Sequence, residues 1–577
     1  MASFLAELKR RNVVKVGAAY AAAAWLLAQI VGTVLPVFDL PDAFLRAVFI
    51  LLGIGFPVTL VLAWIYDLTP EGIQRTADLP IGSTTAQLSG RGLDFTIIGC
   101  LAVAVLFLVV DRFIWSPPTD RSVASIAVLP FEVERPDSET SYLGDGITDR
   151  LIMRLSRLPG LRVKSRSMLR AAEENAQRIG QMLDVDAICL GRLIRRGEVL
   201  EIVVELISVI DGSVMWSNRL QRDFSSLVNL EGEVSAEIAR ALSIELTDAE
   251  EDELSRSPTD NSAAYSLYLQ GRHFWNQRSA DGLRRSADVY RQAVDLDPGY
   301  ALAWSGLADS YLMLFAWGLE RPQEVMPMAR AAATRAIDLD PNLAEPHATL
   351  GYYKTLYERD WDGARAEFLK SIALNDNYST AHHWYAFYLS TIGDSSAAIR
   401  EIRKARDSEP LSPIINAEVS LFLVYDGQYE QAIEELQAAS LWNPDFPSLL
   451  NSLVRAYALD GQHDKAFEVW EKSQESYGDS VVGRGFGNMV LPELGRYDEA
   501  REFYERAVEL SATEYVMPGL LGVLAAGIGD YDAAFAYFDT AVQERSLVIS
   551  WLRDPLIDNL RGDSRYAELF EEVGLTP

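Results

Sequence analysis

Two glycine-containing stretches have the residue types of a phosphate-binding loop. Gly144-Asp145-Gly146 opens a predicted helix, and the N-terminus of a helix can bind an anion. Residues 482–488 read VGRGFGN. The first stretch is incomplete as a nucleotide motif and not adjacent to a preceding strand, and the second follows no strand at all. We therefore interpret them as a capped turn and as the degenerate first helix of a repeat.

The histidines and cysteines also have a structural role rather than a catalytic or metal-binding one in our interpretation. His382 and His383 are adjacent in a predicted helix, so they point in different directions, and neither Cys100 nor Cys189 is near them in sequence. Two cysteines exclude a disulfide framework. The chain contains no Walker loop, no His-Glu-x-x-His and no Gly-x-Ser-x-Gly. We expect no catalytic, cofactor-binding or metal-binding residues and no small-molecule substrate.

The charge of the chain is unevenly distributed. The whole net charge of −30 falls after residue 121, where 43 basic residues face 73 acidic ones. A surface this acidic repels the phosphates of nucleic acids and of anionic lipid headgroups. Composition thus disfavours a nucleic-acid partner.

Residues 1–121 contain three long apolar runs. They span about 13–37, 44–66 and 95–115, and about 20 apolar residues are enough to cross a bilayer. We predict three transmembrane helices in a membrane anchor. Asp111 and Arg112 lie in the last turn of the third run, which makes it the weakest of the three.

Basic residues before the first run and in the second loop place both in the cytoplasm by the positive-inside rule. Three spans then place everything after about residue 116 in the periplasm, with the anchor in the bacterial inner membrane. If the third run does not insert, the remainder is cytoplasmic instead.

The pattern from 122 to 247 predicts a small α/β domain. A strand at 125–131, a helix at 143–158, a strand at 161–167 and a helix at 175–185 precede three strands and a final helix at 226–244. Arg196-Gly197 and Asp211-Gly212 are hairpin signals. The segments SIAVLPF, YLGDGITDRLIMRLSRLPGLRV, DAICLGRLIRRGEVLEI and IDGSVMWSNRLQRD together resemble the TolB-like N-terminal domain of bacterial membrane proteins.

From residue 260 onward the sequence repeats about every 34 residues. Pro410 and Pro444 are 34 apart, and Gly478 follows at the same interval. Alanines and large apolar residues recur in steps of three and four, which keeps one helix face inward. The pattern resembles the tetratricopeptide repeat (TPR) family. We expect an all-α superhelix over 260–577, with roughly eight repeats and a C-terminal cap.

The expected architecture is therefore multidomain: transmembrane helices, a small α/β domain and a TPR superhelix. The resemblance implies that the first helix of each repeat lines a groove for a protein or peptide. By register alone we predict these groove residues: Asp309, Tyr352, His383, Phe387, Asn451 and Arg455.

We predict a non-catalytic, membrane-anchored scaffold of the bacterial envelope. The alternative is the periplasmic sensor half of a signalling system. Proteins that look like this one often carry a cyclase or a winged-helix domain before the anchor. About eleven residues precede the first span here, so a sensor needs a separate cytoplasmic output protein.

Overall fold

The computed structural model divides the chain into two compact units, Met1–Asp120 and Arg121–Pro577. It describes residues 123–134, 140–158, 160–165, 176–223, 227–244, 246–476, 481–547 and 551–577, the strands β1 and β2, and a few single residues before position 60. Each unit is described by itself.

Little of the first unit is described. Strands β1 (Tyr66–Thr69) and β2 (Gly72–Arg75) form an antiparallel hairpin. The predicted spans at 13–37, 44–66 and 95–115 lie almost entirely outside the described residues. Within the described part of the chain, no helix combines the length and the apolar character needed to cross a membrane.

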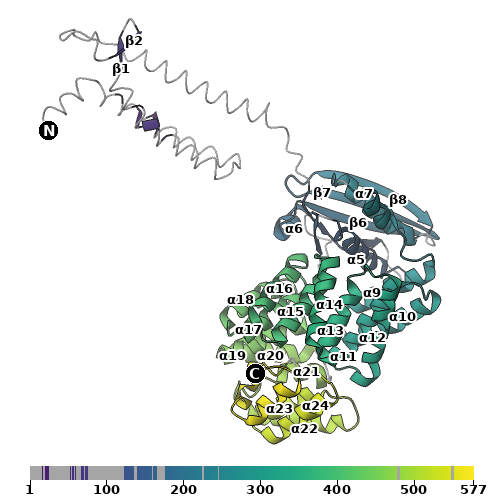
Figure 1. The fold of residues 1–577 in the computed structure, drawn as a ribbon, viewed down its shortest axis with the longest axis vertical. Coiled ribbons are helices and arrows are strands. Elements are labelled where there is room, and N and C mark those ends of the chain that lie inside the picture. Colours follow the sequence, from purple (N-terminus) through teal and green to yellow (C-terminus); the bar gives the residue numbers. More distant parts are fainter. Residues whose placement is uncertain are drawn as a thin grey trace, which may run out of the picture. The chain divides into compact units, whose positions relative to one another are not determined.

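The second unit begins with the predicted small α/β domain (Figure 1). Its strands are β3 (Ser125–Val128), β4 (Glu132–Glu134), β5 (Arg162–Ser165), β6 (Ala187–Arg196), β7 (Val199–Ser208) and β8 (Val214–Asp223). They form one sheet in the order β5-β3-β6-β7-β8, with β4 also beside β6. The first four strands pair in parallel, and β6, β7 and β8 form an antiparallel meander. Gly197 and Gly212 adopt positive φ in the two hairpin turns, as these turns require.

Helices cover the two faces of this sheet unequally. Helices α5 (Leu143–Leu155) and α7 (Leu227–Ala241) bury one face, and α6 (Ala176–Leu183) lies on the other. Alternate residues of β7, such as Ile202 and Val204, point into the α5 and α7 core because strand side chains alternate between faces. The short α8 (Asp248–Ser255), which was not predicted, leads into the repeats.

Eight helix pairs follow in the described residues, stacked beneath the α/β domain in Figure 1. The first helices of the pairs are α9 (Ser262–Asn276), α11 (Ala301–Ala316), α13 (Glu345–Tyr353), α15 (Ser379–Thr391), α17 (Pro413–Tyr425), α19 (Pro447–Leu459), α21 (Val481–Asn488) and α23 (Pro518–Gly527). The second helices are α10 (Ala280–Leu296), α12 (Pro322–Leu339), α14 (Trp361–Leu374), α16 (Ser395–Ser408), α18 (Tyr429–Ser440), α20 (His463–Ser476), α22 (Tyr497–Ser511) and α24 (Tyr531–Gln543).

A left-handed residue marks the turn inside most pairs. Gly393, Gly427, Gly461, Gly495 and Gly529 recur every 34 residues, each with positive φ after the first helix. Glycine adopts this conformation without steric cost, so it ends the helix and reverses the chain. Arg278 and Arg359 hold the same conformation in the first and third pairs, although a side chain costs energy there.

The irregular spacings of the sequence also have a structural origin. The extra residue of the third repeat is absorbed by a π-helical turn, η6 (Lys354–Glu358), that continues α13. The extra residues of the second repeat lengthen α11 and α12 on both sides of Gly318.

Helix α5 attaches the α/β domain to the first repeat. Asp149 accepts hydrogen bonds from Arg272 (3.1 Å) and Asn276 (2.6 Å) of α9. Asp145 lies 2.8 Å from His273 Nδ1. The backbone of the helix comes so close to α9 that a Cβ on Gly146 would lie 2.9 Å from Leu269 Cβ. The α/β domain and the repeats thus share one continuous apolar core.

The other face of α5 holds a buried charged cluster. Arg150 and Arg154 approach the same oxygen of Glu231 on α7, at 3.2 and 3.5 Å. Arg154 also donates to the carbonyl oxygens of Leu254 (2.5 Å) and Arg256 (2.9 Å) at the end of α8. All three charged side chains are buried, so the two cations depend on one carboxylate.

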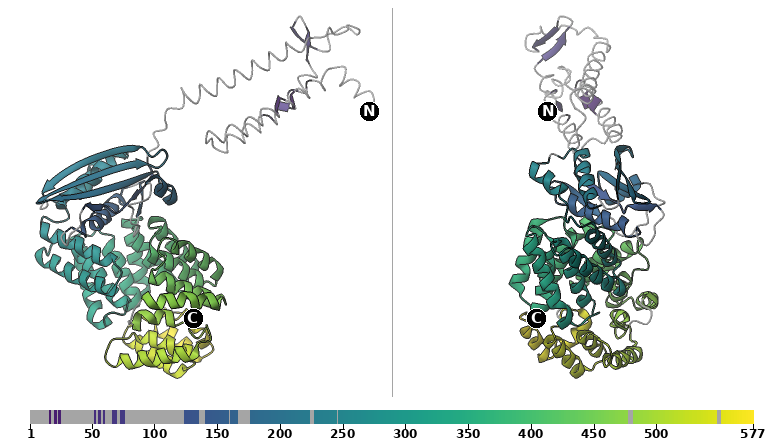
Figure 2. Two further views of the ribbon diagram at one scale, coloured as in Figure 1. Left: turned by 180° about the vertical axis from the view of Figure 1, so that it is seen from behind. Right: turned by 90° about the vertical axis from the view of Figure 1, so that its right-hand side faces the viewer.

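The C-terminal segment closes the stack. It contains the 3-10 helix η7 (Pro555–Leu560) and α25 (Ser564–Glu572). Trp361 donates to the carbonyl oxygen of Val573 (3.2 Å), and Arg553 donates to that of Thr391 (3.0 Å). Gln323 likewise bonds the carbonyl oxygen of Glu544 (2.8 Å). The last repeats therefore lie against the second to fourth ones, which agrees with both views in Figure 2.

We predict that Glu231→Ala destabilises the unit strongly, because it leaves Arg150 and Arg154 buried without a counter-charge. The expected loss is about 3 to 5 kcal/mol of unfolding free energy, measured by urea denaturation of the full-length chain. The control is Glu233→Ala, which breaks the half-exposed contact with Arg222 and should cost at most about 1 kcal/mol. Equal losses in the two variants would contradict this role of Glu231.

Candidate functional site

The first helices of the repeats carry the residues predicted to line the groove. We call this surface the first-helix wall. It comprises the side chains that the first helices, α9, α11, α13, α15, α17, α19, α21 and α23, turn toward the predicted groove. All six predicted residues lie on these helices. Their surroundings differ between the two ends of the array.

Asp309 on α11 is buried and accepts a 2.5 Å hydrogen bond from Thr349 on α13. Burial raises its pKa to about 7, although the hydrogen bond from Thr349 and the charges of Arg272 and Arg278 oppose the shift. The residue links two first helices, and it takes up a proton near neutral pH.

Tyr352 and Phe387 belong to an aromatic cluster on the wall. The ring of Tyr352 stacks on Trp384 with centroids 5.0 Å apart, and it meets Phe387 edge-on at 5.2 Å. Tyr352 and Trp384 are buried, whereas Phe387 is only half-buried. Such pairs hold their rings in defined orientations.

His383 lies half-buried, one turn before Phe387 on α15. Burial and the neighbouring charge of Arg278 lower its pKa to about 3, so the imidazole is neutral at physiological pH. The Arg278 guanidinium itself lies 3.5 Å from the centre of the Trp275 ring. The backbone amide of Arg278 donates to the carbonyl oxygen of Trp275 at 3.4 Å.

Arg455 and Asn451 occupy the C-terminal half of the wall. Arg455 is buried against Asp554 of the C-terminal segment, an ion pair that Tyr425 approaches through its hydroxyl at 3.4 Å. Asn451 is half-buried one turn earlier, beside Gly487 of α21. Register alone could not reveal that the cap uses Arg455.

The cap covers more of this half of the wall. Trp551 lies 6.3 Å from the ring of Phe486 on α21 and packs against Gly519 on α23. Asn559 donates to the carbonyl oxygen of Ala526 at 2.8 Å. The cap therefore lies against α19, α21 and α23 and against the C-terminal ends of α15 and α17.

Glu418 on α17 was not predicted, although it lies 34 residues after Trp384 and so holds the same position of the next first helix. Its Oε2 atom is shielded from solvent and has no hydrogen-bond partner in the described part of the chain. Burial raises the pKa of Glu418 to about 7. Acidic residues are common in this sequence, so only the structure distinguishes this one.

The other reactive residues have structural roles. His382 joins Glu401 (2.7 Å) to the carbonyl oxygen of Asp376 (2.8 Å). Cys189 is buried in the sheet, and burial raises its pKa to about 12. No group of His, Cys, Asp and Glu in the described residues is arranged to hold a metal ion. The VGRGFGN stretch falls in α21, the first helix of a repeat.

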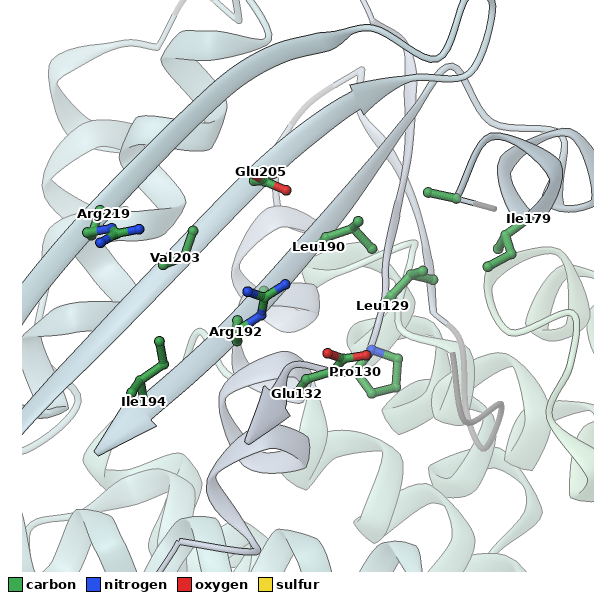
Figure 3. Close-up of a pocket in the computed structure, with 12 residues that line it drawn as sticks. Leu129, Pro130, Glu132, Ile179, Leu190, Arg192, Ile194, Val203, Glu205 and Arg219 are labelled. Carbon is green, nitrogen blue, oxygen red and sulfur yellow. The ribbon is translucent and has the colours of Figure 1, made fainter. Parts of the chain in front are cut away.

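A cavity of about 330 Å³ opens on the less covered face of the sheet (Figure 3). Leu190, Ile194 and Val203 form part of its apolar floor, and Arg192 and Glu205 rise beside them. At the tip of the hairpin between β6 and β7, Arg195 Nε donates to the carbonyl oxygen of Gly197.

Family models match two parts of the chain. Residues 122–240 match the second domain of HilA/YgeH-like transcriptional regulators, and residues 490–514 match a tetratricopeptide repeat. The helical array is thus of tetratricopeptide type. The TolB-like resemblance stays a prediction.

Curated relatives match over part of their length. Putative adenylate cyclase 3 of Rhizobium meliloti is 28% identical over 239 residues, which are 41% of this chain and 40% of that protein. Transcriptional regulator HilA of Salmonella typhimurium is 25% identical over 207 residues, 35% of this chain and 36% of that one. The chain thus spans about two fifths of the length of the relatives that it matches.

Solved structures resemble the chain at low scores. A human IFIT1 dimer with PPP-AAAA shares 16% identity at a TM-score of 0.33, over 54% of this chain and 77% of that one. Pseudomonas aeruginosa pilF shares 16% identity at a TM-score of 0.29, over 39% and 96%. At TM-scores this low, nothing about the ligands of those proteins is inferred for this chain.

We predict that Asp309→Asn makes stability less dependent on pH. A carboxyl whose pKa is raised in the folded state stabilises below its unfolded pKa, and this contribution is lost as the pH rises through about 7. The variant keeps an acceptor for Thr349 and should therefore melt several degrees above the original chain at pH 8, and by a clearly smaller margin at pH 5. Thermal unfolding followed by circular dichroism measures the difference.

The control for this prediction is Asp288→Asn, which alters an exposed carboxylate beside Arg291 on α10. It should change the melting temperature little at either pH. The same gain for Asp309→Asn at pH 5 and pH 8 would show that Asp309 does not titrate near neutrality.

Proposed function

We propose that this chain is a non-catalytic scaffold whose repeats bind a protein or peptide at the first-helix wall. The observation that carries the proposal is the uneven occupation of this wall. The cap lies against α19, α21, α23 and the C-terminal ends of α15 and α17, while the side chains of His383 and Phe387 remain half-buried on α15. Stacked helical repeats present such walls to extended or helical peptides.

A protein partner fits the charge better than a nucleic acid does. The residues after 121 carry the entire net charge of −30, which opposes the approach of phosphates. It favours a partner with a basic surface, because complementary charge accelerates association.

We further propose that residues 1–121 anchor the scaffold in the bacterial inner membrane, with the N-terminus in the cytoplasm and the residues after about 116 in the periplasm. The support is the length of the apolar runs and the placement of basic residues around them. In this proposal the α/β domain is TolB-like.

A second candidate is a sensor that acts through a separate cytoplasmic output protein. It is favoured by the matches to a putative adenylate cyclase and to HilA. In this alternative the partner is a signalling protein. Its binding to the first-helix wall would be transmitted to the α/β domain through the contacts between α5 and α9.

The test is photocrosslinking in native host cells that produce the full-length chain. We would place p-benzoylphenylalanine at position 383 on the wall and, as the matched control, at Leu369, an exposed residue of α14. The expected result is a protein adduct from position 383 that position 369 does not give. No adduct at 383, or the same adducts at both positions, would overturn the proposed function.

The identity of the adduct tests the rest of the proposal. An envelope protein supports the periplasmic scaffold, and a cytoplasmic protein contradicts that location. An adduct that contains a cyclase or a transcriptional regulator would favour the sensor.

A further inference from the structure

An unpaired carboxylate lies on the first-helix wall. The Oε2 atom of Glu418 is shielded from solvent and has no hydrogen-bond partner in the described part of the chain. The side chain as a whole is only half-buried, so its other oxygen is the accessible one. A shielded carboxylate normally lies beside a cation, because an unpaired charge is costly to remove from water.

The surroundings of Glu418 supply no cation. Burial is the cause of its raised pKa, with no described charge offsetting it. The groups that feel its charge are aromatic: together with burial it raises the pKa of Tyr352, and it contributes to the raised pKa of Tyr425. Arg455, the cation that also acts on Tyr425, is already paired with Asp554.

The charge of Glu418 acts on the ring of Tyr352, which belongs to the aromatic cluster. Tyr352 is held by a stacked contact with Trp384 and an edge contact with Phe387. Trp384 holds the position on α15 that Glu418 holds on α17, because the two are one repeat apart. A carboxylate next to aromatic rings is the combination that recognises an organic cation, through a charge-assisted hydrogen bond and the negative ring faces.

We infer that Glu418 and the aromatic cluster of Tyr352, Trp384 and Phe387 form an anchor site for a lysine or arginine side chain of the partner. The inference rests on the proposed function, since it requires a partner at the first-helix wall. The strongly acidic charge of the chain agrees with a basic partner. A basic side chain in the site would give the Glu418 carboxylate the counter-charge that it lacks.

The probes are fluorescein-labelled pools of random dodecapeptides with one central residue fixed as arginine, citrulline, lysine or norleucine. Citrulline and norleucine keep the size of the basic side chains but carry no charge. We expect the full-length chain to bind the two basic pools at least about tenfold more tightly in fluorescence anisotropy, the worth of one charge-assisted contact.

Glu418→Gln should abolish this preference while the protein still folds, since the change keeps the shape of the side chain. Glu434→Gln is the matched control, because Glu434 is an exposed residue of α18, the second helix of the same repeat. A preference for basic pools that persists in Glu418→Gln would overturn the inference, and so would the absence of binding to every pool.

Dependence on pH gives a second readout. Binding of the arginine pool should weaken from pH 8 to pH 6 as Glu418 takes up a proton, and Glu418→Gln should show no such change. The neighbouring Tyr352 and Tyr425 have raised pKa values and His383 a lowered one, so all three stay neutral in this range. A pH profile shared by both proteins would contradict the inference.

These outcomes are separable from those of the proposed function. An adduct at position 383 without a preference for basic pools would retain the scaffold and reject the cation site. Failure of both experiments would reject the two together.

Discussion

The buried contact of Glu231 with Arg150 and Arg154 is the constraint on which the second unit depends. These residues fix α5 against α7 and against the end of α8, which leads into the repeats. The same helix places Asp145 and Asp149 against α9. Because α5 contacts both the α/β domain and the first repeat within one continuous core, the two parts cannot be positioned independently of each other.

The cap imposes a second constraint on the same array. Stacked repeats need a terminal element that covers the apolar face of the last unit. Here that element also reaches back to Trp361 and Thr391, and it buries Asp554 against Arg455. Part of the first-helix wall is therefore used for folding, whereas the aromatic cluster, His383 and Glu418 lie on the helices before α19, where we propose that a partner binds.

Much of this fold could be predicted from the sequence. The 34-residue period fixed the helix pairs, because packing positions repeat with the geometry of the stack. The hairpin turns at Gly197 and Gly212 followed from the conformational freedom of glycine. Short elements without a strong pattern, such as β4 and α8, were missed, since three to eight residues carry little periodicity.

The candidate site was less predictable. Register placed Tyr352, His383, Phe387 and Arg455 on the first helices, but it could not show which of them the chain itself uses. The partner of Arg455 is 99 residues away in sequence, in a segment outside the repeat period. Glu418 was not predicted, because the lack of a hydrogen-bond partner for its Oε2 atom depends on the surrounding fold and leaves no pattern in the sequence.

The most direct test of this account is native-state hydrogen exchange of the full-length chain. If α5 joins the α/β domain and the repeats into one unit, then the protected amides of α5, α7 and α9 should open with the same free energy. The account predicts one shared value for these three helices. Amides of α5 and α7 that open together while α9 stays protected would contradict it.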